Sequence, residues 1–332
     1  MSVLIRDQML GALSPIMRYS TRGRARILMY HRFDEVGDNR RLSANAFEEQ
    51  IRYLKKHYRI VSLSSLVAAV SQGERVDEKT VVITVDDGYA DFARCAYPIL
   101  RRHGVPATLY VVTRFVDQEI WLWFDVLHFM MSSCKRGTYR VKVLGKIFSA
   151  QLDDTYSRGF FWEKLADALV PQTSETKDRE LAQLSRQMKM DIPKLPTNQY
   201  QALTWSDVVE MDPELIEIGA HTVSHPILST CSIDQQRFEI AESKLRIEQM
   251  TNRKATHFCY PNGQIGDYSS DTIDLVKELG FESAVLAHGG FLGKQPNLFM
   301  LERMGAPFEQ RDFAKCIDGV WHLRERLSRS AR

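Results

Sequence analysis

Residues 80–88 have the sequence Thr-Val-Val-Ile-Thr-Val-Asp-Asp-Gly. The first six, Thr80–Val85, form an almost continuous β-branched run, which is typical of a strand buried on both faces. Two adjacent carboxylates, Asp86 and Asp87, follow at the point where this strand is expected to end. Strands covered on both faces occur in parallel sheets, so this stretch predicts an α/β fold with acidic side chains at a strand's carboxyl end.

Similar runs recur along the chain and alternate with amphipathic stretches. The predicted strands are Arg26–His31, Arg59–Leu63, Thr80–Val85, Ala107–Thr113, Leu215–Ala220, Thr256–Tyr260, Glu282–Ala287 and Phe299–Met304. The predicted helices include Ala46–His57, Ala90–His103, Ile233–Met250 and Ser269–Leu279. About eight strands that alternate with helices predict a closed or nearly closed (β/α) barrel rather than an open sheet.

One long segment, residues 115–200, interrupts this alternation. It contains aromatic and helical stretches such as Trp121-Leu-Trp-Phe124 and Gly159-Phe-Phe-Trp162. A barrel loop of this length needs structure of its own, so we predict a helical insertion. The predicted organisation is therefore an N-terminal helical and basic extension, residues 1–25, followed by a barrel over 26–332 that carries this insertion.

The composition is that of an ordinary globular protein. Of 332 residues, 44% are apolar and 26% charged, and the formal net charge is +2. This balance argues against a protein built mainly to bind nucleic acid. The five cysteines are scattered without a CxxC pair, which argues against a disulfide framework and fits a reducing compartment.

The N-terminal extension has two interpretations. An apolar stretch over residues 9–17 lacks the features of a signal peptide, and no run is long enough to span a membrane. The extension is expected to form a helix that either packs on the barrel or lies on an anionic membrane surface, since arginines follow it. We therefore expect a cytoplasmic protein that could contact the inner face of the membrane.

Polar side chains follow four of the predicted strands. They occur in Tyr30-His31, Asp86–Gly88, His221–His225 and Tyr260–Gly263. In a parallel barrel the carboxyl ends of the strands lie on one face, and that face holds the active site. These side chains are therefore expected to meet.

His221 and His225 are separated by four positions, and Pro226 follows them. Because a strand precedes them and a proline follows, they must converge in a tight turn rather than on a regular helix. Two imidazoles and one carboxylate make a three-ligand set that leaves a position open on Zn²⁺ or a similar divalent ion. Of two adjacent carboxylates, one can bind the ion while the other acts as a base. A solvated Asp-Gly turn is the simpler alternative for the carboxylates.

Three motifs resemble those of a known family. Residues Thr84–Gly88, His221-Thr-Val-Ser-His225 and Tyr260-Pro-Asn-Gly263 are similar to the first three motifs of the NodB-type polysaccharide deacetylases, carbohydrate esterase family 4. The resemblance extends from Arg26 to Pro307 outside the insertion and implies the irregular NodB-type barrel. The stretch Leu28-Met-Tyr-His-Arg32 resembles the circularly permuted branch, in which the strand that carries the acid histidine lies at the N-terminus.

The resemblance implies a role for each motif. Asp87, His221 and His225 would bind a divalent metal, with Zn²⁺ expected first, and Asp86 would be the base that deprotonates the attacking water. The backbone N–H of Asn262 would help to hold the oxyanion. Tyr260 and Pro261 would contact the substrate. Trp205, like the tryptophans of the insertion, would belong either to the core or to a glycan-binding cleft.

Two positions depart from the family pattern. Cys259 stands where the third motif normally has arginine, and the Asp-Trp pair of the fourth motif is not visible. Arg303 could supply the missing cation beside Asp86, or it could be a surface residue paired with Glu302. The general acid is expected to be His31, since His288, in Leu286-Ala-His288, comes too soon after the third motif.

The expected activity is metal-dependent hydrolysis of the N-acetyl group of an N-acetylhexosamine. The substrate would be an N-acetylated polysaccharide or oligosaccharide, or a lipid-linked amino sugar. Two alternatives remain open from the sequence. One is a hydrolase of cyclic amides or imides on the same barrel, and the other is a glycan-binding relative without catalytic activity.

Overall fold

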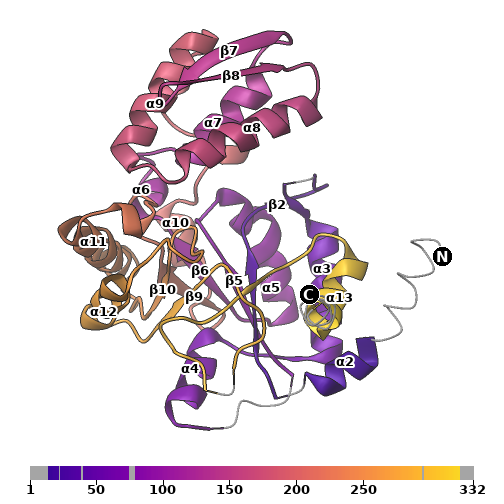
Figure 1. Cartoon of the computed structure of the whole chain (residues 1–332). Coiled ribbons are helices and arrows are strands. Elements are labelled where there is room, and N and C mark those ends of the chain that lie inside the picture. Colours follow the sequence, from indigo (N-terminus) through magenta and orange to yellow (C-terminus); the bar gives the residue numbers. More distant parts are fainter. Residues whose placement is uncertain (1–13, 22, 39, 75–78, 294, 322–332) are drawn as a thin grey trace, which may run out of the picture.

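A parallel sheet forms the centre of the larger lobe (Figure 1). The computed structural model describes residues 14–21, 23–38, 40–74, 79–293 and 295–321. The strands follow the order β11-β10-β9-β6-β5-β1-β12, and β4 also pairs with β5. Their bounds are β1 Arg26–Tyr30, β4 Arg59–Ile60, β5 Thr80–Val85, β6 Ala107–Val111, β9 Ile216–Ala220, β10 His257–Cys259, β11 Ser283–Val285 and β12 Met304–Gly305. The predicted α/β architecture is confirmed.

The two edges of the sheet are joined by the chain that leads into β12. Leu301 exchanges backbone hydrogen bonds with β11, to Ala284 O and from Leu286 N–H, at 2.9 Å each. Met304 then pairs with Leu28 of β1. The barrel is therefore closed by one segment that changes partners. This change of partners makes the segment largely irregular, so the strand predicted over Phe299–Met304 shrinks to β12.

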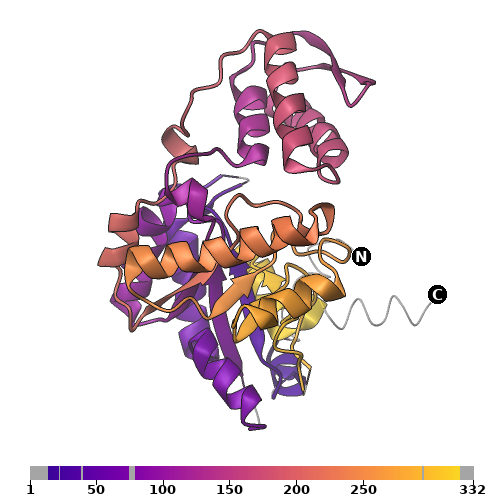
Figure 2. The ribbon, with the colours of Figure 1, turned by 90° about the vertical axis from the view of Figure 1, so that its left-hand side faces the viewer.

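Helices cover the outside of the sheet, as Figure 2 shows for the long α11. The barrel helices are α3 Ala44–His57, α4 Leu63–Ser71, the π-helix η1 Phe92–Ala96, α5 Tyr97–His103, α6 Thr113–Val116, α10 Trp205–Glu210, α11 Ile233–Thr251, α12 Ser270–Glu278 and α13 Gln310–Asp318. Short elements complete the lobe: β2 Phe33–Asp34, β3 Leu42–Ser43, η2 Asn198–Tyr200 and η3 Leu228–Thr230. Side-chain caps mark several starts; the Ser232 hydroxyl, for example, accepts the Gln235 N–H at the start of α11.

The segment predicted as a helical insertion stands above the barrel as a second lobe (Figure 1). It contains α7 Trp123–Ser133, α8 Thr155–Leu169 and α9 Ser174–Met188, but also an antiparallel hairpin of β7 Thr138–Val143 and β8 Lys146–Gln151. The hairpin corrects the purely helical prediction. Its turn has two positive φ angles, 50° at Leu144 and 78° at Gly145, as a two-residue hairpin turn requires. The lobe has a core of its own around Leu127, Phe161 and Leu184.

The N-terminal extension is described only in part. Helix α2, Ser14–Ser20, lies beside α13, where the Arg18 guanidinium contacts the Asp318 carboxylate at 3.3 Å. Residues 1–13, Arg22 and most of the C-terminal arginines lie outside the described residues. Among the described residues, no helix has the length and apolar character needed to cross a membrane.

A close contact beside the site gives a stability prediction. A Cβ atom on Gly219 of β9 would lie 2.5 Å from the Tyr110 ring, so we expect Gly219→Ala to lower the free energy of unfolding by about 1–3 kcal/mol. In the matched control, Gly159→Ala in α8, the new methyl group meets no atom within 4 Å. The control should raise the free energy of unfolding by about 0.5–1 kcal/mol. Urea denaturation measures both, and equal shifts would contradict the packing argument.

Candidate active site

The predicted site residues converge at the carboxyl ends of the strands. Asp86 and Asp87 follow β5, His221 follows β9, and His31 follows β1. A cavity of about 370 Å³ is lined by these side chains together with His225, Tyr260, Asn262 and Arg303. The structure therefore brings together residues from four different strand ends, and the simpler interpretation of Asp86-Asp87 as a solvated turn fails because both are buried.

Three of these side chains are arranged as a metal site. Asp87 Oδ1 lies 3.6 Å from His221 Nε2 and 3.6 Å from His225 Nε2. Bonds of about 2.1 Å at a tetrahedral angle would place ligand atoms about 3.4 Å apart, so this set fits a zinc-sized ion with little movement. Asp87 and His221 are buried, and the His225 side chain is 11% exposed. The set leaves one side open toward the cavity, as a catalytic site requires.

The tautomer of His221 is determined by a backbone contact. Its Nδ1 lies 2.8 Å from the carbonyl oxygen of Cys259. The nitrogen must carry a proton in order to donate to a carbonyl, so in the neutral ring it is Nε2, which faces Asp87, that has the lone pair a metal ligand needs. Strand β10 thus orients a ligand that β9 provides.

The loops that carry the candidate metal ligands contain strained backbone. The φ angles are 76° at Asp87, 68° at Thr222, 61° at His225 and 59° at Asn262. Residues other than glycine rarely adopt this region, and strain of this kind concentrates at functional sites. At His221–His225 it forms the tight turn that the sequence required, because a helix would use only negative φ values.

Side chains hold this turn in place. The buried Thr222 hydroxyl accepts the His225 N–H at 3.0 Å. The Glu239 carboxylate, on α11, accepts the N–H groups of Val223 and Ser224 at 2.9 Å each. The sequence analysis missed Glu239 because it lies within the following helix, outside the motif that it supports, and no local pattern marks it.

Asp86 is held by a buried ion pair. Arg303 donates from Nη1 to Oδ1 at 2.7 Å and from Nη2 to Oδ2 at 2.6 Å. Burial works to raise the pKa of Asp86, but the guanidinium outweighs it and leaves the pKa below its usual value. Asp86 is therefore a carboxylate at neutral pH. Arg303 is 1% exposed, so the alternative of a surface arginine paired with Glu302 is wrong.

The remaining donors of Arg303 are also used. Nε donates to the carbonyl oxygen of Leu286 at 2.6 Å, and Nη1 donates to the Thr84 hydroxyl at 2.9 Å. Thr84 in turn donates to the Leu28 carbonyl at 2.8 Å. Thr84 was predicted as part of a strand and of the first motif, and its contact with the arginine could not be read from β5 alone.

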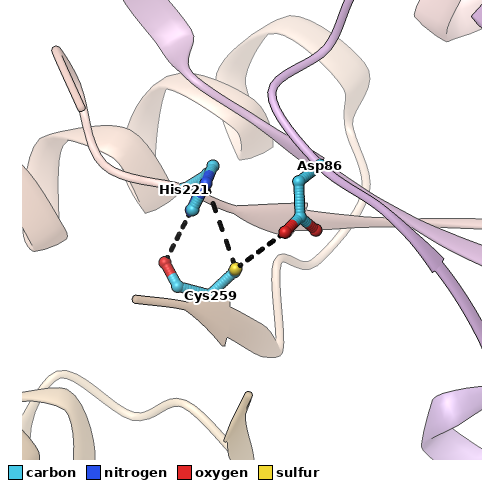
Figure 3. Close-up of side chains that lie close together, drawn as sticks. All are labelled: Asp86, His221 and Cys259. Atoms are coloured by element: carbon cyan, nitrogen blue, oxygen red, sulfur yellow. Dashed lines mark hydrogen bonds between the residues drawn. The ribbon is translucent and has the colours of Figure 1, made fainter. Parts of the chain in front are cut away.

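Cys259 lies between Asp86 and His221, as Figure 3 shows. Its Sγ is 3.6 Å from Asp86 Oδ2 and 4.0 Å from His221 Nε2, so Asp86, His221 and Cys259 form a second group with ligand-type atoms. A cation is disfavoured there, because Arg303 Nη2 already lies 3.2 Å from the sulfur. Burial also raises the pKa of the Cys259 thiol, whereas a metal requires the thiolate. The Asp87 set is therefore the better metal site.

The two candidate acids differ in position. His31 lines the cavity, and its Nε2 lies 3.8 Å from Asp86 Oδ2. His288 is not among the residues that line the cavity, and its Nε2 is buried without a hydrogen-bond partner in the described part of the chain. The position of His31 on the cavity favours it over His288 as the general acid.

Some of the predicted substrate-binding and oxyanion residues line the cavity and others do not. Tyr260 lines the cavity, and its hydroxyl is bound to the Phe299 carbonyl at 3.1 Å. Asn262 lies at the rim, where its side chain donates to Asp267. Pro261 is buried and does not line the cavity. Trp205 packs in the barrel core and donates to Asp117, which agrees with the core alternative for this residue rather than with a place in the cavity.

The insertion adds two cavity residues that the sequence analysis missed. Phe124 packs edge-on against His225 at 5.6 Å between ring centroids, and Asp125 is a buried carboxyl that accepts the Tyr89 hydroxyl at 2.6 Å. Burial raises the pKa of Asp125 to about 6, against the opposing effect of Arg32. The available signal was a lone carboxylate in the apolar run Trp123-Phe-Asp-Val-Leu127.

The family model for polysaccharide deacetylases matches residues 73–284. The chain belongs to the polysaccharide deacetylase family. A putative polysaccharide deacetylase of Bacillus subtilis (strain 168), YxkH, is 21% identical over 279 residues, which cover 84% of this chain and 70% of that protein. The Streptococcus pyogenes deacetylase PplD in complex with acetate has the same fold, with a TM-score of 0.57 at 20% identity over 87% of this chain and 96% of that one. The deacetylase is thus a hydrolase that acts on carbohydrate, and the cyclic-amide and non-catalytic alternatives are set aside.

One relative has a more specific name. The poly-β-1,6-N-acetyl-D-glucosamine N-deacetylase of Escherichia coli (strain K12) is 37% identical over 87 residues, which span 25% of this chain but 13% of that protein. The predicted NodB-type barrel is confirmed by the family and the fold. Membership of the circularly permuted branch stays a prediction.

The ion pair gives a prediction for stability. Arg303→Met leaves Asp86 buried without its counter-ion, so we expect the free energy of unfolding to fall by about 3–5 kcal/mol. In an Asp86→Asn background the same substitution should cost at least about 1 kcal/mol less, because no unpaired carboxylate remains. Denaturant unfolding of the four proteins measures the coupling, and an equal cost in both backgrounds would refute it.

Proposed function

We propose that this deacetylase removes the acetyl group from an N-acetylhexosamine unit of a glycan with the help of a divalent metal ion. Zn²⁺ is the ion that we propose. The observation that carries the proposal is the Asp87–His221–His225 set, with Oδ1 of Asp87 3.6 Å from both imidazoles, directly beside a second carboxylate that Arg303 keeps ionised. An ion held there would polarise the acetamide carbonyl and promote ionisation of water.

The protein's own residues then have separate tasks. Asp86 accepts the proton of the attacking water, and the Asn262 N–H stabilises the oxyanion at the rim. His31, on the same cavity, protonates the leaving amine. Arg303 holds Asp86 in its ionised form and orientation, so its role is that of a positioning residue.

The size of the site supports a glycan substrate. The catalytic cavity of about 370 Å³ is followed by a second cavity of about 690 Å³, and both are lined by His225. A single acetamido sugar fills only part of this space, so a chain of sugars or a sugar with a large substituent fits better. The relatives that act on poly-β-1,6-N-acetyl-D-glucosamine agree with this class.

A lipid-linked amino sugar belongs to the same proposal. The five cysteines are all free, which supports a reducing compartment, and arginines cluster near both ends of the chain. We therefore propose a cytoplasmic enzyme whose termini approach the anionic inner face of the membrane.

Metal dependence is tested by metal analysis combined with acetate release from N-acetylglucosamine oligosaccharides. Chelation should abolish acetate release, and added Zn²⁺ should restore it. Asp86→Asn should retain the metal and lower kcat by about 10²- to 10⁴-fold, whereas His225→Ala should lose the metal as well. If no such oligosaccharide yields acetate while metal is bound, the proposed activity is wrong.

The assignment of the acid is tested by two single variants. His31→Ala should lower kcat by at least about 10²-fold, because the leaving amine loses its proton donor. His288→Ala should change kcat by less than about threefold, because the ring lies outside the cavity. Loss of turnover in His288→Ala alone would reverse the assignment.

A further inference from the structure

A second cavity lies between the insertion and the barrel. Its volume is about 690 Å³, and its walls include Trp123 and Lys177 from the insertion and His225 and Phe238 from the barrel. His225 also lines the catalytic cavity. The two cavities therefore lie on either side of one predicted metal ligand.

Lys177 is the unusual residue of this cavity. It is 2% exposed, and within the part of the chain that the structure describes its ammonium group has no hydrogen bond or ion pair. Its Nζ lies 5.0 Å from the centroid of the Trp123 ring. Lys177 lines the cavity, and an ammonium group that has lost part of its hydration without gaining an acceptor is destabilised. Such a group is stabilised when a ligand brings an acceptor to it.

The other charges of this cavity are already paired or lie outside its interior. Arg114 pairs with Glu119 at 3.0 Å, and the Glu239 carboxylate is occupied by the His221–His225 turn. The remaining carboxylates, Glu175, Asp178 and Asp234, are exposed. The interior thus holds one unpaired positive charge, while the exposed carboxylates would repel a polyanion.

Apolar surface accompanies this charge. Phe238, on α11, is 57% exposed although its ring is large and apolar. Trp123 contributes a second aromatic wall on the side of the insertion. Aromatic walls beside a few polar groups are the usual composition of a site that binds the apolar face of a ligand and orients it by its polar groups.

We propose that this cavity is a glycan subsite next to the catalytic cavity, and that it binds a sugar carrying a single anionic substituent, a carboxylate or a phosphate, which pairs with Lys177. Phe238 and Trp123 contact the sugar. The inference rests on the proposed deacetylase function and narrows its substrate to a glycan with one negative charge close to the N-acetylated unit.

The test compares acetate release from three oligosaccharides of equal length. One is a neutral N-acetylglucosamine oligomer, one carries a uronic acid next to the acetylated unit, and one carries a phosphate at that position. Wild type should have a lower KM for at least one anionic oligomer than for the neutral one. Lys177→Met should raise the KM for that oligomer by about 10- to 100-fold and leave kcat and the neutral KM within about threefold. Comparison of the uronic acid with the phosphate identifies the anion.

Two variants separate binding from folding. Lys177→Arg retains the charge and should keep most of the preference for the anionic oligomer. The matched control is Lys164→Met in α8, since Lys164 also lies over an aromatic ring, 4.4 Å from the centroid of Phe160, but is exposed and away from the cavity. It should change neither KM. Phe238→Ser, at an exposed position, should raise the KM of the anionic oligomer by about 2- to 10-fold even where Lys177→Met fails to fold.

The outcomes distinguish the two proposals. If wild type releases acetate without preferring either anionic oligomer, or if Lys177→Met raises both KM values equally, the subsite is overturned and the deacetylase function stands. If wild type with bound metal releases no acetate from any oligomer, the proposed function fails. Calorimetric titration with the same three oligomers then still tests the subsite, which requires tighter binding of an anionic oligomer and its loss in Lys177→Met.

Discussion

The buried pair of Asp86 and Arg303 joins the closure of the barrel to its chemistry. Asp86 ends β5 in the middle of the sheet, and Arg303 lies on the segment that links β11 to β1. The guanidinium also donates to Thr84 in β5 and to the carbonyl oxygen of Leu286, which follows β11, so its donors join two strands of the sheet. A buried pair of this kind adds little net stability, but loss of one partner is costly. The contact that keeps Asp86 ionised is therefore made by the segment that joins the two edges of the sheet.

The predicted metal ligands depend on the same frame in a different way. Asp87, Thr222 and His225 have positive φ values, and local sequence would not choose this conformation unaided. The strain persists because the surroundings leave the loops no other arrangement: the Cys259 carbonyl fixes His221, and Glu239 binds two N–H groups of the turn. These contacts hold the three candidate ligands in place by themselves, and such preorganisation would limit the ordering cost of binding an ion.

The sequence predicts best what is encoded locally. Strand β5 has the predicted bounds because every residue in it is buried, so composition alone marks it. The grouping of Asp87 with His221 and His225 follows from motifs after β5 and β9, whose carboxyl ends lie at the same edge of the parallel sheet with β6 between them. The role of Arg303 stayed ambiguous because its partner, Asp86, is 217 positions away in the sequence. Asp125 was missed because its raised pKa comes from burial, which no sequence spacing indicates. The β7–β8 hairpin was overlooked in a segment dominated by helical aromatic stretches, although its Leu144-Gly145 turn is a local signal.

The barrel and the insertion contribute different residues to the two cavities. The barrel alone supplies the predicted ligands, the base and its arginine. The start of α7 supplies Phe124 and Asp125 to the catalytic cavity and Trp123 to the neighbouring one. Because the start of α7 lines both cavities, substitutions in the insertion can alter which glycan fits while the carboxylates and imidazoles at the strand ends stay unchanged. A lobe with its own core can absorb such changes, whereas the barrel rim, held by strained turns and one buried ion pair, cannot. Substrate choice in this deacetylase is therefore expected to reside in the insertion, and its chemistry in the strand ends.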